Sequence, residues 1–82
     1  METTEIERSI RKIVVAVSGL SEHADADADL YLDLGMASVH ALVLLTELEE
    51  RFGVPIPDEQ FVEATSIAKL TATLSALLNT HV

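Results

Sequence analysis

The sequence predicts an all-α fold, a small helical bundle that forms one domain over residues 1–82. Aliphatic side chains recur at helical spacing in three segments, which predicts three main helices. Apolar residues make up 49% of the 82 positions but aromatic residues only 4%, so aliphatic side chains must build the core. Because so short a chain buries only about 60% of its unfolded surface, we expect this core to be thin.

The first helix is expected over Thr4–Ser18. Thr4 and Glu7 have the spacing of a capping box, in which each side chain bonds a free backbone N–H group at the helix start. Gly19 stands where a helix commonly ends. Five apolar residues recur at helical spacing and predict one buried face: Ile6, Ile10, Ile13, Val14 and Val17.

A long connection follows at residues 20–31. Its alternating Asp and Ala residues, 25–29, predict a solvated loop. An EF-hand calcium loop beginning at Asp25 would need Gly at its sixth position and Glu at its twelfth, and this chain has Leu and Met there, so we reject that reading. Three leucines after the loop are expected to fix its end to the core: Leu30, Leu32 and Leu34.

Residues 32–52 predict a loop, a tight turn and a second helix, with Ser38 where the helix begins. Gly35 allows backbone angles that other residues resist, and Val39 to Phe52 contain neither Gly nor Pro. A helix N-terminus offers free N–H groups and the positive end of the dipole, so a phosphodiester on the Ser38 oxygen would lie in a favourable field. On position alone, Ser38 is also a plausible helix N-cap, a common role for serine.

The second helix carries two apolar faces. One should face the core, and its members are Ala41, Leu44, Leu45, Leu48 and Phe52. The other contains Val39, Leu42, Val43 and Thr46. A central helix buried on most sides would also hide Leu42. The alternative is that Val39 and Val43 stay partly exposed beside Ser38, with the acidic Glu47 and Glu50 further along the helix.

Gly53 should end the second helix, and Val54 and Ile56, each followed by Pro, should be extended and plug the core. Asp58 can cap a short third helix over residues 59–62.

The last helix should be capped by Thr65 or Ser66. Its core stripe is Ile67, Leu70, Leu74, Leu77 and Leu78.

The net charge is −9, and three of the five cations lie close together, Arg8, Arg11 and Lys12. Residues 13–50 hold eight carboxylates and no Lys or Arg, so nucleic acid is disfavoured and basic protein partners are favoured, although acidity also serves solubility. No Cys is present, which excludes disulfides and thiolate metal sites. The longest apolar runs are too short to span a membrane and the polar N-terminus is no secretory signal, so we expect a cytoplasmic monomer.

The histidines carry no metal or catalytic signal. His23, His40 and His81 lack metal-ligand spacing, and we expect all three to face solvent. His40 lies two residues after Ser38, on a different face of a helix, and is a poor base for it. We therefore predict no catalytic residue and no metal, and a hydrolase using Ser38 is a weak alternative.

Three motifs together resemble the acyl and peptidyl carrier proteins. They are LGMASV at residues 34–39, EERFGVPIPDE at 49–59 and FVEATSIAKL at 61–70. The resemblance runs from about Asp29 to Leu78, and the first helix fits the family as well. It implies a four-helix bundle with a short third helix and a long first loop. It also implies that Ser38 carries 4′-phosphopantetheine, whose thiol holds the cargo, and that the chain is a freestanding carrier and not an enzyme.

The same resemblance implies the partners. They are a phosphopantetheinyl transferase, a cargo-loading ligase or acyltransferase, and downstream synthase or tailoring enzymes of a fatty acid, polyketide or nonribosomal peptide pathway. The surface that meets them is expected at Val39, Leu42, Val43, Glu47 and Glu50. The family usually has Asp before the serine and this chain has Ala37, so a polar contact for the transferase is missing. The alternative is an unmodified, carrier-like protein-interaction module.

Overall fold

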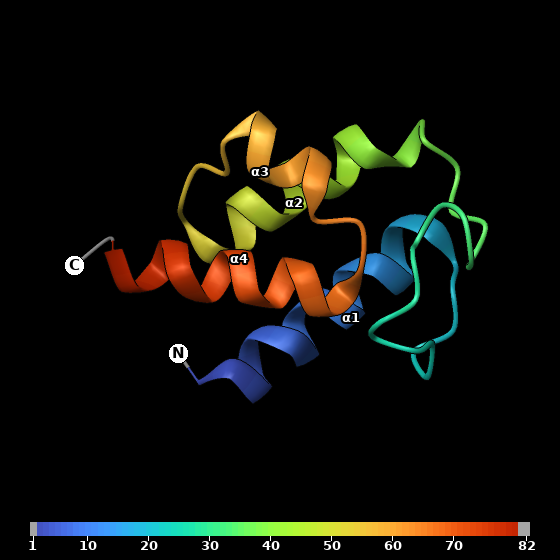
Figure 1. The fold of residues 1–82 in the computed structure, drawn as a ribbon, viewed down its shortest axis with the longest axis horizontal. Helices are drawn as coiled ribbons and strands as arrows, with labels where there is room; N and C mark the ends of the chain where they lie inside the picture. Colours follow the sequence, from blue (N-terminus) through green and yellow to red (C-terminus); the bar gives the residue numbers. More distant parts are fainter. Residues whose placement is uncertain (1, 81–82) are drawn as a thin grey trace.

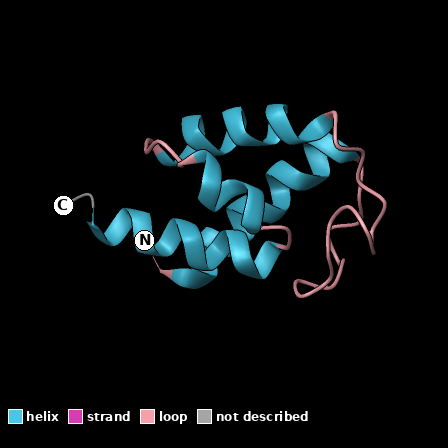
Figure 2. Cartoon of the chain, turned by 45° about the horizontal axis from the view of Figure 1, so that its top comes forward, coloured by secondary structure: helices cyan, strands magenta, loops and turns pink. Residues whose placement is uncertain are grey.

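Four α-helices joined by loops make up the computed structural model, which describes residues 2–80 (Figure 1). The helices are α1 (Thr3–Ser18), α2 (His40–Phe52), α3 (Asp58–Glu63) and α4 (Ile67–Thr80). α1 packs against both α4 and α2, while the short α3 lies on α4. The long loop between α1 and α2 lies at one end of the bundle (Figure 2). The predicted all-α bundle with a short third helix and a long first loop is confirmed.

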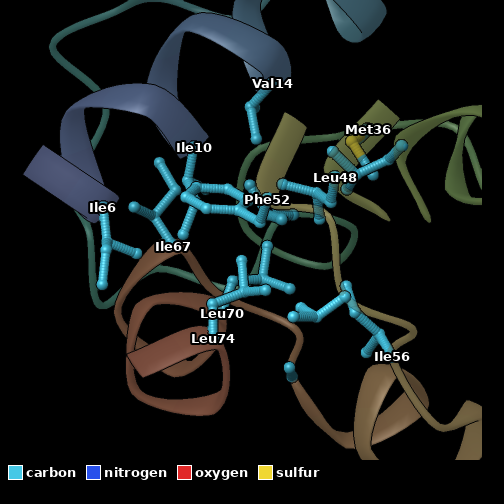
Figure 3. Packing of buried hydrophobic residues seen from close by; sticks show 14 residues of the cluster. Ile6, Ile10, Val14, Met36, Leu48, Phe52, Ile56, Ile67, Leu70 and Leu74 are labelled. Carbon is cyan, nitrogen blue, oxygen red and sulfur yellow. The ribbon is translucent and has the colours of Figure 1, made fainter. Parts of the chain in front are cut away.

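One hydrophobic core joins the helices and two of the loops. In Figure 3 the α1 residues Ile6 and Ile10 and the α4 residues Leu70 and Leu74 surround Phe52 of α2. The predicted stripes are confirmed except at Ala41, which lies outside the core cluster and lines a hollow at the surface. Ile13, Val17, Leu45, Leu77 and Leu78 are half-buried at the edge of the core. The prediction of one domain over residues 1–82 stays a prediction, which this single core supports. The buried apolar residues are Ile6, Ile10, Val14, Leu30, Met36, Leu44, Leu48, Phe52, Val54, Ile56, Ala64, Ile67, Leu70 and Leu74.

The start of α1 differs from the prediction and its end agrees. The helix begins at Thr3, its N-cap is Glu2, and no side chain caps it, so the predicted capping box at Thr4 is wrong. Thr4 is already helical, whereas a capping residue needs an extended backbone. At the other end Gly19 adopts φ 75° and its N–H donates to the carbonyl of Val15 at 2.8 Å, as expected of a glycine that ends a helix.

The long loop is tied to the start of α4 by backbone hydrogen bonds. The N–H of Leu30 donates to the carbonyl of Thr65 at 2.8 Å, and the N–H of Ala68 donates to that of Ala26 at 2.9 Å. Leu30 is fully buried, so its predicted role as an anchor is confirmed. The loop is therefore held in place by the core and by the segment that enters α4.

Leu32 does not anchor the loop, contrary to the prediction. Its side chain is 87% exposed, while Leu34 is half-buried. The backbone N–H groups of Tyr31 and Leu32 both donate to Asp29 Oδ1 at 2.9 Å, and this turns the chain. Because residues 31–34 form a turn, Leu32 does not lie on the same side as Leu30. The alternation that predicted three anchors holds only for extended chain.

In the segment between α2 and α4, the predicted core residues and the predicted cap of α4 are confirmed, but the predicted cap of α3 is not. Val54 and Ile56 are buried, and the N–H of Ile56 donates to Glu49 Oε2 at 2.8 Å. Asp58 is the first residue of α3 and caps nothing; the N-cap is Pro57, so that prediction is wrong. Ser66 caps α4, since its Oγ accepts the N–H of Lys69 at 3.1 Å.

Within residues 2–80 no helix is long and apolar enough to cross a bilayer.

Candidate functional site

Ser38 lies in an exposed turn that leads directly into α2. The carbonyl of Ala37 accepts the N–H of His40 at 3.0 Å, and the carbonyl of Ser38 accepts the N–H of Ala41, also at 3.0 Å. Val39 holds the N-cap position, and no side chain makes a cap hydrogen bond there, so the alternative reading of Ser38 as the N-cap is wrong. The hydroxyl is therefore free of the helix, at the positive end of the α2 dipole.

The residues just before Ser38 fix the position of this turn. Gly35 has φ +76°, a conformation that residues with a Cβ rarely adopt. Met36 is 4% exposed, and its N–H donates to the carbonyl of Leu30 at 2.7 Å. Ala37 and Ser38 come next and are exposed. An anchored residue thus stands two positions before the serine, which is presented to solvent from a fixed base.

A mostly apolar hollow of about 300 Å³ opens beside Ser38. Its lining comes from the loop, α2, α3 and the segment before α4, and consists of Tyr31, Ser38, Ala41, Phe61, Val62 and Thr65. Burial raises the pKa of the Tyr31 phenol, and the nearby Asp29 charge adds to that rise. Tyr31 is therefore a neutral phenol in this wall near pH 7.

Asp29 organises the loop behind this hollow. The pKa of the Asp29 carboxyl lies below its ordinary value, mainly because the N–H of Leu32 donates to it. Desolvation opposes this lowering. The N–H of Tyr31, a hydrogen bond from the Thr65 side chain and the charge of Lys69 add to it. The backbone N–H of Asp29 in turn donates to Asp33 Oδ2 at 2.9 Å. The carboxylate form of Asp29 therefore stabilises the turn that carries Tyr31 and Leu32.

One face of α2 is apolar near Ser38 and acidic further along. Val39 is 74% exposed, Leu42 73% and Val43 49%, and both Glu47 and Glu50 are exposed. We call these five residues the α2 face. The alternative that a central helix buries Leu42 is wrong, because the core side of α2 is filled by the stripe Leu44, Leu48 and Phe52.

Two further exposed apolar residues were not predicted, Leu32 in the loop and Val62 in α3, which is 70% exposed. Val62 follows the half-buried Phe61, and a helix of one and a half turns cannot direct two successive side chains into one core. That spacing was a usable signal. For Leu32 the signal was Asp29, three residues earlier, whose side chain can accept backbone N–H groups and form a turn.

His40 does not face solvent as predicted, and this is the largest departure among the polar residues. The ring is half-buried, and its Nδ1 atom is shielded from solvent without a hydrogen-bond partner. His40 Nδ1 therefore makes no bond to the Ser38 hydroxyl. His23 is exposed, and its Nε2 lies 3.4 Å from Glu22 Oε1. His81 lies outside the described residues. Across residues 2–80, no three His, Asp or Glu side chains are grouped to hold a metal ion.

The comparisons with known proteins agree with this geometry. The family model described as "Phosphopantetheine attachment site" matches residues 8–74. An acyl carrier protein of Akkermansia muciniphila is 34% identical over 73 residues, which cover 88% of this chain and 91% of that protein. The non-reducing polyketide synthase pkbA of Emericella nidulans is 29% identical over 79 residues, 96% of this chain but only 3% of the synthase.

A solved structure of an acyl carrier protein from Enterococcus faecalis has the same fold. It superposes with a TM-score of 0.79 at 19% identity and covers 94% of this chain and 99% of that one. The cofactor of the matching family is phosphopantetheine, and acyl carrier proteins are carriers that catalyse no reaction themselves. Together with the match to an acyl carrier protein over most of both chains, this shows that the chain belongs to the phosphopantetheine-binding carrier proteins.

Proposed function

We propose that Ser38 is the residue that carries 4′-phosphopantetheine. The observation that supports this most directly is an exposed serine hydroxyl, free of any capping role, at the start of α2 within the matched region. The turn fits a phosphodiester, because the adjoining helix start presents a positive dipole end to an anion. Ser38 Oγ would hold the phosphate, and the mostly apolar hollow lies next to it.

The prosthetic group supplies a thiol that holds cargo as a thioester. The cargo that we propose is an acyl, aminoacyl, or growing polyketide or peptide intermediate. The chain's own contribution is to hold Ser38 on a rigid bundle and to keep the cargo close to successive enzymes, which raises its effective concentration. Because the modification draws on coenzyme A, we expect the protein to act in the cytoplasm.

The α2 face is our proposal for the surface that partner enzymes recognise. A carrier of this family implies a phosphopantetheinyl transferase and synthase enzymes as partners. Val39, Leu42 and Val43 would be covered by the partner, and the exposed Glu47 and Glu50 would attract a basic surface. The net charge of −9 favours the same kind of partner. A loading ligase or acyltransferase and tailoring enzymes would share this surface.

Ala37 is the feature that distinguishes this chain from the usual motif. It is exposed beside Ser38, so an Asp there would be available to a transferase. With Ala in place of Asp at this position, the transferase loses one polar contact and the fold is not disturbed. This residue is also what keeps the alternative open, a carrier-like module that docks on partners without a prosthetic group.

The test is the intact mass after incubation with coenzyme A and a promiscuous phosphopantetheinyl transferase. We expect the wild type to gain one phosphopantetheine and Ser38→Ala to gain none. Ser9→Ala is a matched control that removes a serine hydroxyl elsewhere and should leave the gain intact. Ala37→Asp should speed the reaction by restoring the missing contact.

Each other result has a definite meaning. A mass gain on Ser38→Ala would show that another residue is the attachment site. No gain on the wild type, but a gain on Ala37→Asp, would mean that Ala37 blocks the modification. No gain on either would contradict the proposal and favour the unmodified interaction module.

A further inference from the structure

Four of the five basic side chains of this acidic chain lie close together. Arg8, Arg11 and Lys12 belong to α1, and Arg51 stands in the last turn of α2. Three of them surround a hollow of about 280 Å³, whose lining residues are Glu5, Arg8, Ser9, Lys12 and Arg51. We call it the basic hollow. Its positive charge stands against the net charge of −9 of the whole chain.

Two of these cations have no anionic partner within the protein. Across residues 2–80, the side chains of Arg8 and Lys12 make no hydrogen bond and no ion pair. Arg11, by contrast, pairs with Glu7 at 3.3 Å and donates to two carbonyls of the long loop. Glu5 lines the basic hollow but is not ion-paired with any described residue. The charges of Arg8 and Lys12 are therefore available to an anion from outside.

Arg51 is held in place as the third cation of the basic hollow. Its Nη2 donates to Ser9 Oγ at 3.3 Å, which brings the guanidinium from α2 across to α1. The guanidinium carbon also lies 5.7 Å from the centre of the Phe52 ring, a favourable cation–π distance. Neither contact supplies a negative charge. Three cations from two helices thus face a single carboxylate, that of Glu5, and a further anion would be attracted.

The basic hollow is continuous with the α2 face. Lys12 also lines a second hollow, of about 440 Å³, together with Val43 and Glu47 of the α2 face. A protein docked on that face therefore lies within reach of Lys12. Across residues 2–80, Lys12 and Glu47 form no ion pair with each other, although they line the same hollow. Each is therefore open to a charge of the docked protein.

The arrangement of the charges favours a protein carboxylate over an extended polyanion. Glu47 and Glu50 are exposed and lie just before Arg51 in the same helix. A nucleic acid or an anionic membrane that covered the basic hollow would also cover these carboxylates and be repelled by them. A docked protein avoids this repulsion, because it can place cations opposite Glu47 and Glu50 and a carboxylate opposite Arg8 and Lys12.

We propose that the enzyme docked on the α2 face places an aspartate or glutamate carboxylate in the basic hollow, against Arg8, Lys12 and Arg51. The chain is then recognised by charges of opposite sign on two helices, which fixes its orientation on the enzyme. This inference rests on the proposed carrier function for the identity of the enzyme, the phosphopantetheinyl transferase. The contact can be measured on Ser38→Ala, so failure of the contact and failure of the modification are separate results.

The first experiment is carbodiimide cross-linking of the chain to the promiscuous phosphopantetheinyl transferase, followed by mass spectrometry of the linked peptides. The reagent joins a lysine amine to a carboxylate in direct contact with it. The chain has two lysines, both exposed, and Lys69 on α4 is the internal control for Lys12. We expect Lys12 to be linked to an Asp or Glu of the transferase and Lys69 to remain unlinked. The same link should form with Ser38→Ala.

The second experiment compares transfer rates for two matched charge reversals, Lys12→Glu and Lys69→Glu. Each makes the chain two charges more negative, so general attraction to a basic enzyme would make both variants faster. A carboxylate opposite Lys12 predicts the reverse for one of them. Lys12→Glu should slow transfer by about three- to tenfold at low salt, whereas Lys69→Glu should not slow it. Arg8→Glu should be slowed like Lys12→Glu, and circular dichroism checks the fold of all three.

Each other result has a clear reading. Equal rates for the two lysine variants would overturn the proposal, as would links from Lys69 as frequent as those from Lys12. Transfer to Ser38 without any Lys12 link would remove the basic hollow from the docking surface and leave the carrier function intact. A Lys12 link to the transferase without transfer to Ser38 would support the contact and contradict the attachment site. Links from Lys12 only to a second copy of the chain would assign the hollow to self-association and overturn the proposal.

Discussion

At the scale of single residues, position relative to a turn decides what each polar side chain does. Asp29 and Asp27 belong to the same acidic run, yet Asp29 Oδ1 accepts two backbone N–H groups, whereas Asp27 contributes its own N–H to Asp25 Oδ1 at 2.9 Å. Composition describes the two aspartates alike, as solvated loop residues. Only the local turn makes one of them structural.

Asp29→Asn should therefore lower stability in a way that depends on pH. Because the folded-state pKa of Asp29 lies below the ordinary 3.8, its charged form favours folding, and this contribution is complete above about pH 5. It is lost as pH falls through the lowered folded-state pKa. The difference in unfolding free energy between wild type and Asp29→Asn should be largest near pH 7 and shrink toward zero in acid.

Urea unfolding measured across this pH range checks the prediction. Asp27→Asn is the control, since it removes a carboxylate from the same loop but no hydrogen-bond acceptor of the turn. A constant difference at every pH would mean that the charge of Asp29 contributes nothing.

At the scale of helices, apolar periodicity predicted the elements well and capping patterns predicted their ends unevenly. The stripes on the first, second and last helices identified their buried faces, because burial of an aliphatic side chain is a strong and repeated signal. A cap depends on the backbone angles of one residue. Thr4 and Asp58 have capping side chains but lie inside their helices, whereas Ser66 lies just outside.

This difference predicts unequal effects of two similar substitutions. Ser66→Ala should cost about 1 kcal/mol of unfolding free energy, because it removes the acceptor of the Lys69 N–H at the start of α4. Thr4→Ala should change stability by less than about 0.5 kcal/mol, since Thr4 is exposed and caps nothing. Thermal or urea unfolding of the pair provides the comparison, and equal losses would refute the assignment of Ser66 as the cap.

The acidic end of α2 gives a prediction about docking. The double reversal Glu47→Lys and Glu50→Lys should slow transfer of phosphopantetheine to the chain by about tenfold at low salt, because it replaces attraction to a basic partner by repulsion. Added salt screens both the attraction in the wild type and the repulsion in the variant. The difference between their transfer rates should therefore become smaller as the salt concentration rises. Glu5→Lys with Glu63→Lys makes the same change of charge on α1 and α3 and serves as the control. An unchanged transfer rate in the α2 variant would remove these two residues from the docking surface.

The parts of the site that the sequence did not predict depend on contacts between elements. Ser38 and the exposure of Val39 could be inferred from a motif and a local pattern. The half-burial of His40 could not be inferred, because His40 lines a groove together with α1 residues that lie far from it in the sequence. The hollow beside Ser38 likewise joins Tyr31 and Phe61 from distant segments.

At the scale of the whole molecule, the protein is small, with a radius of gyration of 11.5 Å, and depends on one core. Leu44→Ala should cost about 2 to 5 kcal/mol, because Leu44 is fully buried. Since domains of this kind are stable by only about 5 to 15 kcal/mol, that loss is large. Leu42→Ala, two residues earlier and 73% exposed, should change stability by less than about 0.5 kcal/mol. Similar losses for the two variants, measured by urea unfolding, would contradict the assigned faces of α2.

The backbone hydrogen bonds between the long loop and the entry to α4 have a consequence for the order of events during synthesis. The N–H of Leu30 and the carbonyl of Ala26 find their partners in Thr65 and Ala68, which leave the ribosome after Ser38 does. A nascent chain that ends before α4 therefore lacks the hydrogen bonds that tie the loop before the serine turn to α4. We expect the amides of Leu30 and Ala68 to exchange their hydrogens at matching rates in the finished protein, as members of one cooperative unit. We also expect a chain arrested before α4 to be a poor substrate for any enzyme that requires the folded turn.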